Sequence, residues 1–118
     1  MAELYGSHAT PVYDFLEQLD PELNELIQRF AYDQLWLRPG LTIREKSITT
    51  VSAVVATGSE RAMRLHMLGF LSSGGTVEEL RAILVHLIGY VGFPPVLAAF
   101  TVLQQIRGEA EVNAEAAK

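Results

Sequence analysis

Hydrophobic residues recur at helical spacing along most of the chain. In this pattern an apolar residue returns to one face of the helix every three or four positions, as in Leu23, Leu26, Ile27 and Phe30. No segment alternates with the two-residue period of a strand. The pattern predicts core helices over residues 21–37, 42–57, 59–73, 76–92 and 94–107, with a shorter helix over residues 10–18. The β-branched run 48–55 is assigned to a helix because a capping pair precedes it and Gly58 follows it.

Capping residues mark the expected helix ends. Asp20 precedes Pro21, which places a capping side chain before a proline at the first helical position. Left-handed glycines are typical of helix C-termini, and prolines open helices more readily than they continue them. The further signals are the capping-box pairs Thr42–Glu45 and Thr76–Glu79, the glycines Gly58 and Gly74-Gly75, and Pro94-Pro95.

Residues 82–100 form an apolar stretch about long enough to cross a bilayer. Gly92-Phe93-Pro94-Pro95 divides it, because adjacent prolines are not accommodated inside one helix. We therefore interpret the stretch as two helices that are apolar nearly all round, and not as a membrane span. A chain of 118 residues has difficulty burying both completely, so the remaining apolar surface predicts a homo-oligomer interface.

Composition narrows the possible functions. We expect one domain over residues 1–118, with a variable N-terminal segment over 1–19 and a frayed or solvated helical tail over 108–118. The absence of cysteine excludes disulfides, thiol nucleophiles and thiolate metal sites. A net charge of −5 without a long basic run disfavours nucleic acid as a partner. No export signal is visible at the N-terminus, so a cytoplasmic location is expected.

Two histidines are the candidate chemical groups. His86 lies in an apolar helix and shares one stripe with Glu79 and Tyr90. A histidine in such a helix is more often a satisfied core residue, whereas its functional role would be a general acid or an oxyanion donor. His66 lies on the preceding helix, and two histidines on consecutive helices favour a shared pocket. Neither shows metal-ligand spacing, and no metal site is expected.

Arg38 is the candidate anion-binding residue. It stands two positions after Trp36 at a helix end that is followed by Pro39 and Gly40. Arginines at helix C-termini commonly complement the helix dipole, so an anion clamp and a capping role both remain open. The sequence contains no nucleophile elbow, phosphate loop or dinucleotide fingerprint.

Four segments together resemble the carboxymuconolactone decarboxylase family. The run 30–41, Phe-Ala-Tyr-Asp-Gln-Leu-Trp-Leu-Arg-Pro-Gly-Leu, resembles that family's F-A-x-x-x-x-W-x-R-P-G-L motif. The other segments are Lys46-Ser47-Ile48-Thr49-Thr50, His66 with Gly74 and Glu78-Glu79-Leu80-Arg81, and His86-Leu87-Ile88-Gly89-Tyr90-Val91-Gly92-Phe93-Pro94. The resemblance covers residues 20–105 and implies an all-α, AhpD-like domain of about six helices, assembled as a trimer or hexamer.

The same superfamily includes AhpD-like alkylhydroperoxidases with a Cys-x-x-Cys-x-x-x-His motif. When His66 is aligned with the histidine of that motif, Ser59 and Ala62 occupy the two cysteine positions. Ser47 stands where those enzymes carry a glutamate. The redox pair and its acid are therefore missing, and thiol peroxidase activity is not expected.

The resemblance implies a cofactor-free decarboxylation of a small carboxylated lactone, similar to 4-carboxymuconolactone. On this hypothesis His86 donates a hydrogen bond or a proton, while His66 and Tyr90 orient it or share charge. Arg38, or a basic residue of a neighbouring subunit, would bind the substrate carboxylate. The other residues assigned to the substrate pocket are Trp36, Ser47, Leu68 and Phe93.

Departures from the family pattern leave two alternatives open. A basic position of the family is Leu68 here, and its Asn-Asn pair is Ser72-Ser73. Together with Phe70 and Phe93, Leu68 favours a second hypothesis. That hypothesis is decarboxylation or cyclisation of a larger, more apolar aromatic or polyketide-like substrate. A third is a non-catalytic oligomer that binds a ligand.

Overall fold

The computed structural model describes residues 9–116, and of residues 9–12 and 114 the backbone alone. The variable segment expected over residues 1–19 therefore lies partly outside the described residues, and His8 lies wholly outside them. The helices are α2 (Ala9–Leu19), α3 (Pro21–Ile27), η2 (Gln28–Leu35), α4 (Ile43–Thr57), α5 (Glu60–Ser72), α6 (Val77–Val91) and α7 (Phe93–Ala116). Because η2 continues α3, residues 9–116 form six helices and no strand. The prediction of an all-α domain of about six helices is confirmed.

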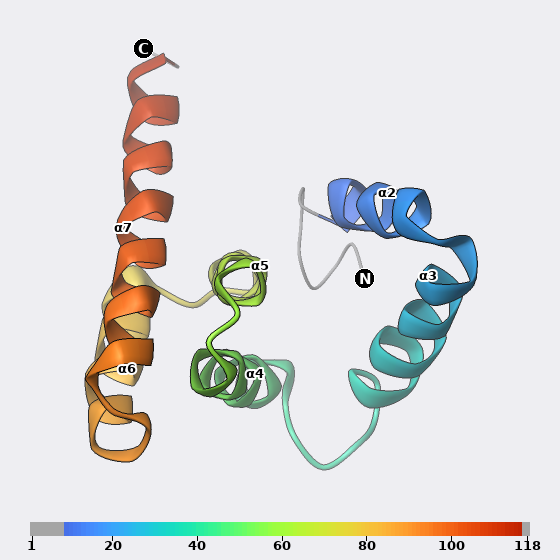
Figure 1. Ribbon diagram of the computed structural model, residues 1–118, viewed down its shortest axis with the longest axis horizontal. Helices are drawn as coiled ribbons and strands as arrows, with labels where there is room; N and C mark the ends of the chain where they lie inside the picture. Colours follow the sequence, from blue (N-terminus) through green and yellow to red (C-terminus); the bar gives the residue numbers. More distant parts are fainter. Residues whose placement is uncertain (1–8, 117–118) are drawn as a thin grey trace.

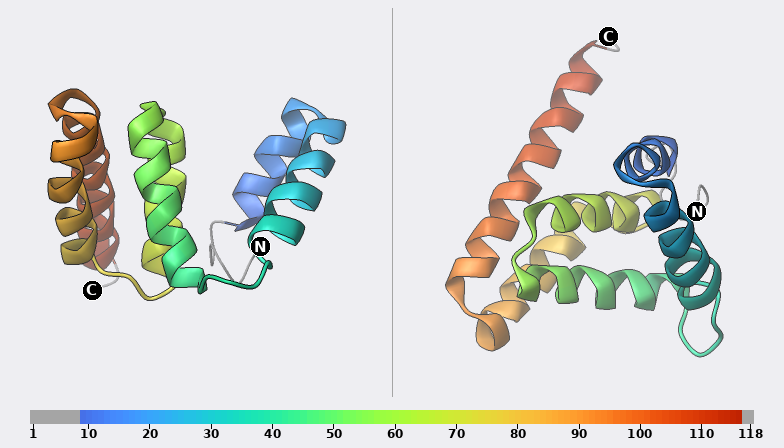
Figure 2. Two further views of the ribbon diagram at one scale, coloured as in Figure 1. Left: turned by 90° about the horizontal axis from the view of Figure 1, so that it is seen from below. Right: turned by 45° about the vertical axis from the view of Figure 1, so that its right-hand side comes forward.

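The helices are arranged as pairs (Figures 1 and 2). α6 packs on α7, α4 packs on α5, and α2 packs on α3, which runs on into η2. α5 and α4 also pack on α7, and α4 packs on α6, so α4–α7 form one body. We call α2, α3 and η2 the N-terminal unit, because these segments pack mainly on one another.

The hydrophobic core lies within α4–α7. Its buried members are Val51, Val55, Met63, Met67, Phe70, Leu80, Leu84, Leu87, Val96, Ala99, Val102, Leu103 and Ile106. A separate, smaller cluster surrounds buried Tyr32 of η2, and Leu65 of α5 is the member that comes from the other body. Tyr32 and Leu65 therefore provide an apolar contact between the N-terminal unit and α4–α7.

The predicted caps are present. Thr42 with Glu45, and Thr76 with Glu79, each form both hydrogen bonds of a capping box. The Asp20 side chain accepts a hydrogen bond of 3.0 Å from the backbone N–H of Leu23. These local bonds explain why the starts of α3, α4 and α6 lie within one residue of their predicted positions.

The apolar stretch 82–100 is divided as predicted. Gly92 adopts φ +87°, which stops α6 at Val91 and lets α7 begin at Phe93. None of the helices in the described part of the chain meets the length and hydropathy needed to cross a membrane. At its other end α7 continues to Ala116 rather than ending at Arg107, so residues 108–116 belong to a helix with a largely exposed surface.

The helix predicted over residues 21–37 differs from the observed one in its second half. Over η2 the backbone is a π-helix, and at its end the N–H of Trp36 donates to Ala31 O at 3.1 Å, five residues back. A π-helix has a longer repeat than an α-helix, so it changes the direction in which Trp36 leaves the helix. Such segments are frequent at functional sites. Hydrophobic spacing over eight residues cannot distinguish the two helix types.

Candidate functional site

Two hollows lie between the N-terminal unit and the α4–α5 pair. The Trp36 pocket has a volume of about 270 Å³ and is lined by Leu35, Trp36, Arg38, Pro39, Leu41, Lys46, Thr49 and Thr50. The Phe15 pocket has a volume of about 430 Å³ and is lined by Phe15, Leu16, Ile27, Tyr32, Ser59, Arg61, Ala62 and Leu65. The two pockets share no lining residue.

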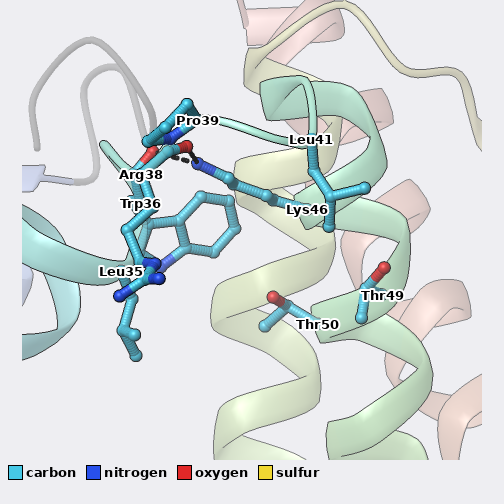
Figure 3. Close-up of a pocket in the computed structure, with 8 residues that line it drawn as sticks. All are labelled: Leu35, Trp36, Arg38, Pro39, Leu41, Lys46, Thr49 and Thr50. Carbon is cyan, nitrogen blue, oxygen red and sulfur yellow. Dashed lines mark hydrogen bonds between the residues drawn. The ribbon is translucent and has the colours of Figure 1, made fainter.

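The Trp36 pocket is formed by the end of η2 and the following loop on one side, and by the first turns of α4 on the other (Figure 3). Lys46 crosses between them. Its Nζ donates hydrogen bonds to Trp36 O at 2.8 Å and to Arg38 O at 2.6 Å. These carbonyls follow a helix C-terminus, where acceptors lack intrahelical partners and a cation is favourable. The ammonium has three N–H donors, so one remains for a ligand in the pocket.

Lys46→Met is expected to lower the free energy of unfolding by about 1.5–3 kcal/mol, the range for a hydrogen bond to a charged group. The variant should also be cleaved faster by protease within residues 36–42, because the loop loses its bonds to α4. Urea denaturation and limited proteolysis measure the two effects. Arg29→Met is the control, since its ion pair with Glu25 is exposed at 3.6 Å and should contribute less than about 0.5 kcal/mol. Equal losses in the two variants would contradict the anchoring role of Lys46.

The two predicted histidines occupy different surroundings. His66 on α5 is half-buried, and burial lowers its pKa below the ordinary value of 6.5. His86 on α6 is exposed, and its ring lies 5.2 Å from the ring of Tyr90, tilted by 39°. Both helices pack on α4 and α7. Neither histidine lines the Trp36 pocket or the Phe15 pocket.

The lowered pKa of His66 predicts a pH dependence of stability. Below pH 6.5 the unfolded chain binds a proton at this position that the folded protein does not bind. Stability should therefore fall as the pH drops from 6.5 toward the folded-state pKa, and the contribution should level off below it. Urea denaturation of the wild type and of His66→Gln between pH 7.5 and about 5 would measure this. Identical slopes in the two proteins would contradict the prediction.

The other predicted pocket residues are dispersed. Ser47 is 3% exposed on α4, and Leu68 packs against the core of α4–α7. Phe93 is exposed at the start of α7. Of the five residues assigned to substrate binding, the structure brings Trp36 and Arg38 together in one pocket. The hypothesis that the remaining three contact substrate stays a prediction.

Sequence reasoning missed three features of the two pockets. Lys46 was not among the predicted binding residues, although it stands at the basic position of the family-like segment 46–50. Phe15 and Arg61 were also missed, because no sequence motif surrounds either residue. The Arg61 guanidinium carbon lies 4.4 Å from the centre of the Phe15 ring. Their contact joins α2 to α5, which are far apart in the sequence.

The carboxylates and histidines of residues 9–116 are dispersed with respect to metal binding. No group of three or more such residues in that part of the chain lies close enough together to hold a metal ion. The side chains that the described pockets offer to a ligand are cationic, hydroxyl-bearing and aromatic.

The fold and the Trp36 pocket define a small helical protein that presents two cationic side chains at a pocket of about 270 Å³. Residues 21–105 match the carboxymuconolactone decarboxylase family, and the chain belongs to this family. It is 28% identical over 99 residues to a 4-carboxymuconolactone decarboxylase of Acinetobacter baylyi, covering 84% of this chain and 74% of that protein. It is 31% identical over 81 residues to the nitrosuccinic acid decarboxylase npaB of Metarhizium robertsii, covering 69% of this chain and 57% of that protein.

These likenesses bear on the kind of enzyme. Both relatives are named as decarboxylases, which supports a decarboxylase, a carbon–carbon lyase, for this chain. The predicted family is confirmed.

Proposed function

We propose that this protein decarboxylates a small carboxylated lactone, similar to 4-carboxymuconolactone, without a cofactor. The observation that carries the proposal is the Trp36 pocket, where Arg38 and Lys46 line one small hollow with an aromatic wall. A pocket with two cations suits a small substrate bearing more than one carboxylate. Family membership and the name of the Acinetobacter baylyi relative support the same substrate class.

The chemistry needs little from the protein. The departing carboxylate of such a lactone sits on the carbon γ to a conjugated carbonyl, so the electrons of the broken C–C bond move into the lactone. The product is CO2 and a dienolate, which takes one proton at the α carbon. Nitrosuccinic acid, named for the fungal relative, has a nitro group that is an electron sink of the same kind. The protein must bind carboxylate, stabilise the developing oxyanion and deliver a proton.

We assign these tasks to residues as follows. Arg38 and the third N–H of Lys46 bind carboxylate, and the Trp36 indole forms the wall against which the ring lies. His86 supplies the proton or the oxyanion hydrogen bond, with Tyr90 in ring contact beside it. His66 is kept neutral at pH 7 by burial, and so can orient a ligand without adding charge.

His86 lines neither the Trp36 pocket nor the Phe15 pocket of its own chain, so this assignment requires a second subunit. α6, which carries His86, and α7 expose several apolar residues, namely Val85, Tyr90, Phe93 and Leu97. The N-terminal unit likewise exposes Leu23, Leu26 and Phe30. Exposed apolar surface of this extent is typical of subunit interfaces. We propose a homo-oligomer, a trimer or hexamer, that acts in the cytoplasm in the breakdown of aromatic acids.

The test is CO2 release from 4-carboxymuconolactone by the purified protein, with its assembly measured by light scattering. Arg38→Gln should raise KM more than it lowers kcat, because it removes a carboxylate partner present before and during the reaction. Arg81→Gln, an exposed arginine on α6, is the matched control. No turnover by a folded oligomer would reject the proposed substrate and favour an apolar substrate or a ligand-binding role.

A further inference from the structure

We infer that the Phe15 pocket is a second binding site, which takes an apolar monocarboxylic acid and binds its carboxylate through Arg61. This inference does not depend on the reaction proposed above. It rests on the walls of the pocket, on the position of Arg61 and on the polar groups at the start of α5.

The walls suit an apolar ligand body. Phe15, Leu16 and Ile27 come from the N-terminal unit, and Ala62 and Leu65 come from α5. The volume of about 430 Å³ lies within the usual range of about 300–1,000 Å³ for small-molecule sites. Such sites combine mostly apolar walls with a few polar groups that orient the ligand. Here those groups are Arg61, Ser59 and Tyr32.

Arg61 is held in position to receive an anion. Its guanidinium carbon lies 4.4 Å from the centre of the Phe15 ring, in a cation–π contact. A cation–π contact uses the charge of the guanidinium and not its carboxylate-binding fork of N–H donors, which can still bind both oxygens of a carboxylate. The contact also fixes the side chain, so less conformational entropy is lost when a ligand binds.

The pairing of the arginines supports this role. In the described part of the chain Arg29 pairs with Glu25, Arg44 with Glu79 and Arg64 with Glu109. Arg61 has no described carboxylate within ion-pair distance, and the same holds for Arg38 in the other pocket. Arg81 and Arg107 are also without such a partner, but they line neither pocket. The unpaired charge at the rim of an apolar cavity is complementary to an acid with an apolar body.

The start of α5 adds further polar groups next to Arg61 in the sequence. Ser59 caps the helix by accepting a hydrogen bond of 3.3 Å from Ala62 N–H, which leaves its hydroxyl hydrogen to donate. The backbone N–H groups of Glu60 and Arg61 have no partner within the helix, as is general for a first turn. A carboxylate held by Arg61 therefore lies near the positive end of α5.

The two pockets select different acids. The Trp36 pocket is the smaller and has two cations, whereas the Phe15 pocket is larger, mostly apolar and has one. A second negative charge in the Phe15 pocket would lie against Leu16, Ile27 or Leu65 without a partner, at a cost in desolvation. The ligand is therefore a monocarboxylate with an aromatic or aliphatic body.

The probes for the test are 2-naphthoate and its neutral analogue 2-naphthamide, titrated into the full-length protein. Calorimetry gives the affinities, and methyl NMR shifts at Leu16, Ile27 and Leu65 locate the site. Arg61→Gln should weaken naphthoate about tenfold or more and leave naphthamide nearly unchanged, because it removes a charge-assisted bond. Ala62→Phe, which fills the cavity from α5, should abolish binding of both. Arg81→Gln and Arg38→Gln should bind naphthoate like the wild type.

Several outcomes would overturn the inference. These are no naphthoate binding at millimolar concentration, equal affinity for acid and amide, or shifts centred on the exposed faces of α6 and α7. An equal effect of Arg61→Gln and Arg81→Gln would do the same. Circular dichroism of Ala62→Phe shows whether the variant folds, and if it does not, Arg61→Gln alone decides. Because binding is read without turnover, failure of the lactone assay leaves this result unaffected.

Discussion

His86→Ala is expected to reduce the turnover of 4-carboxymuconolactone by about 10²–10⁴-fold, the usual contribution of a positioned general acid. Protonation of the dienolate needs a proton donor whose pKa lies near the operating pH. Histidine is the side chain whose ordinary pKa is closest to neutrality. His86 is exposed, and its ring lies beside the ring of Tyr90. The substitution should therefore leave the free energy of unfolding within about 0.5 kcal/mol of the wild type.

The assay must separate lost chemistry from lost assembly. Gln104→Ala, an exposed polar position on α7, is the control for a surface truncation. Light scattering on each variant establishes whether the oligomer persists, and Tyr90→Phe tests whether the hydroxyl beside His86 contributes. If His86→Ala retains full turnover in an intact oligomer, the proton comes from another group, and His66 becomes the next residue to replace.

Phe70→Ala is expected to destabilise the fold by about 3–5 kcal/mol, the range for removing a buried aromatic ring. Phe70 is 2% exposed and belongs to the core of α4–α7. The Arg44 guanidinium lies 5.5 Å from its ring centre, and the backbone of Gly75 approaches it closely. A Cβ atom at position 75 would lie 2.1 Å from the ring, so neighbouring atoms are already packed tightly against it. Guanidinium denaturation followed by circular dichroism measures the loss.

The control for Phe70→Ala is the truncation of an exposed apolar side chain within the same α4–α7 body. Val112→Ala removes a side chain that is 67% exposed on α7, and it should change stability by less than about 0.5 kcal/mol. A loss below about 1 kcal/mol for Phe70→Ala would mean that the site collapses without a cavity. In that case the tight packing of Phe70 against Gly75 would be an incorrect description of the core.

The positions of the helices could be predicted because their determinants are local. A capping box joins residues three apart, as in Thr42–Glu45, and Gly58 adopts φ +80° at the end of the same helix. Gly92 likewise separates α6 from α7 through its own backbone conformation. None of these interactions needs a partner from a distant part of the chain. The family could be predicted for a related reason, since its motifs are short and occur in a definite order.

The candidate site was predicted only in part. Trp36 and Arg38 lie in one pocket, and they were found because they stand two residues apart at one helix end. The π-helical turn before them shifts Trp36 through a backbone bond to Ala31, which hydrophobic spacing does not indicate. Lys46 contributes through bonds to carbonyls eight and ten residues earlier, and those distances depend on how the loop folds back.

The tertiary structure decided which helix faces meet. His66 and His86 were expected to share a pocket because they lie on consecutive helices. Neither lines the Trp36 pocket or the Phe15 pocket, and a site that contains both stays a prediction. The tertiary structure also brings Phe15 of α2 into contact with Arg61 of α5. The sequence by itself determined the starts of the capped helices and the family, because hydrogen bonds and caps act within a few residues. The π-helical segment η2 and the extension of α7 to Ala116 were not determined in this way. The pairing of faces depends on packing summed over distant residues, which local patterns do not contain.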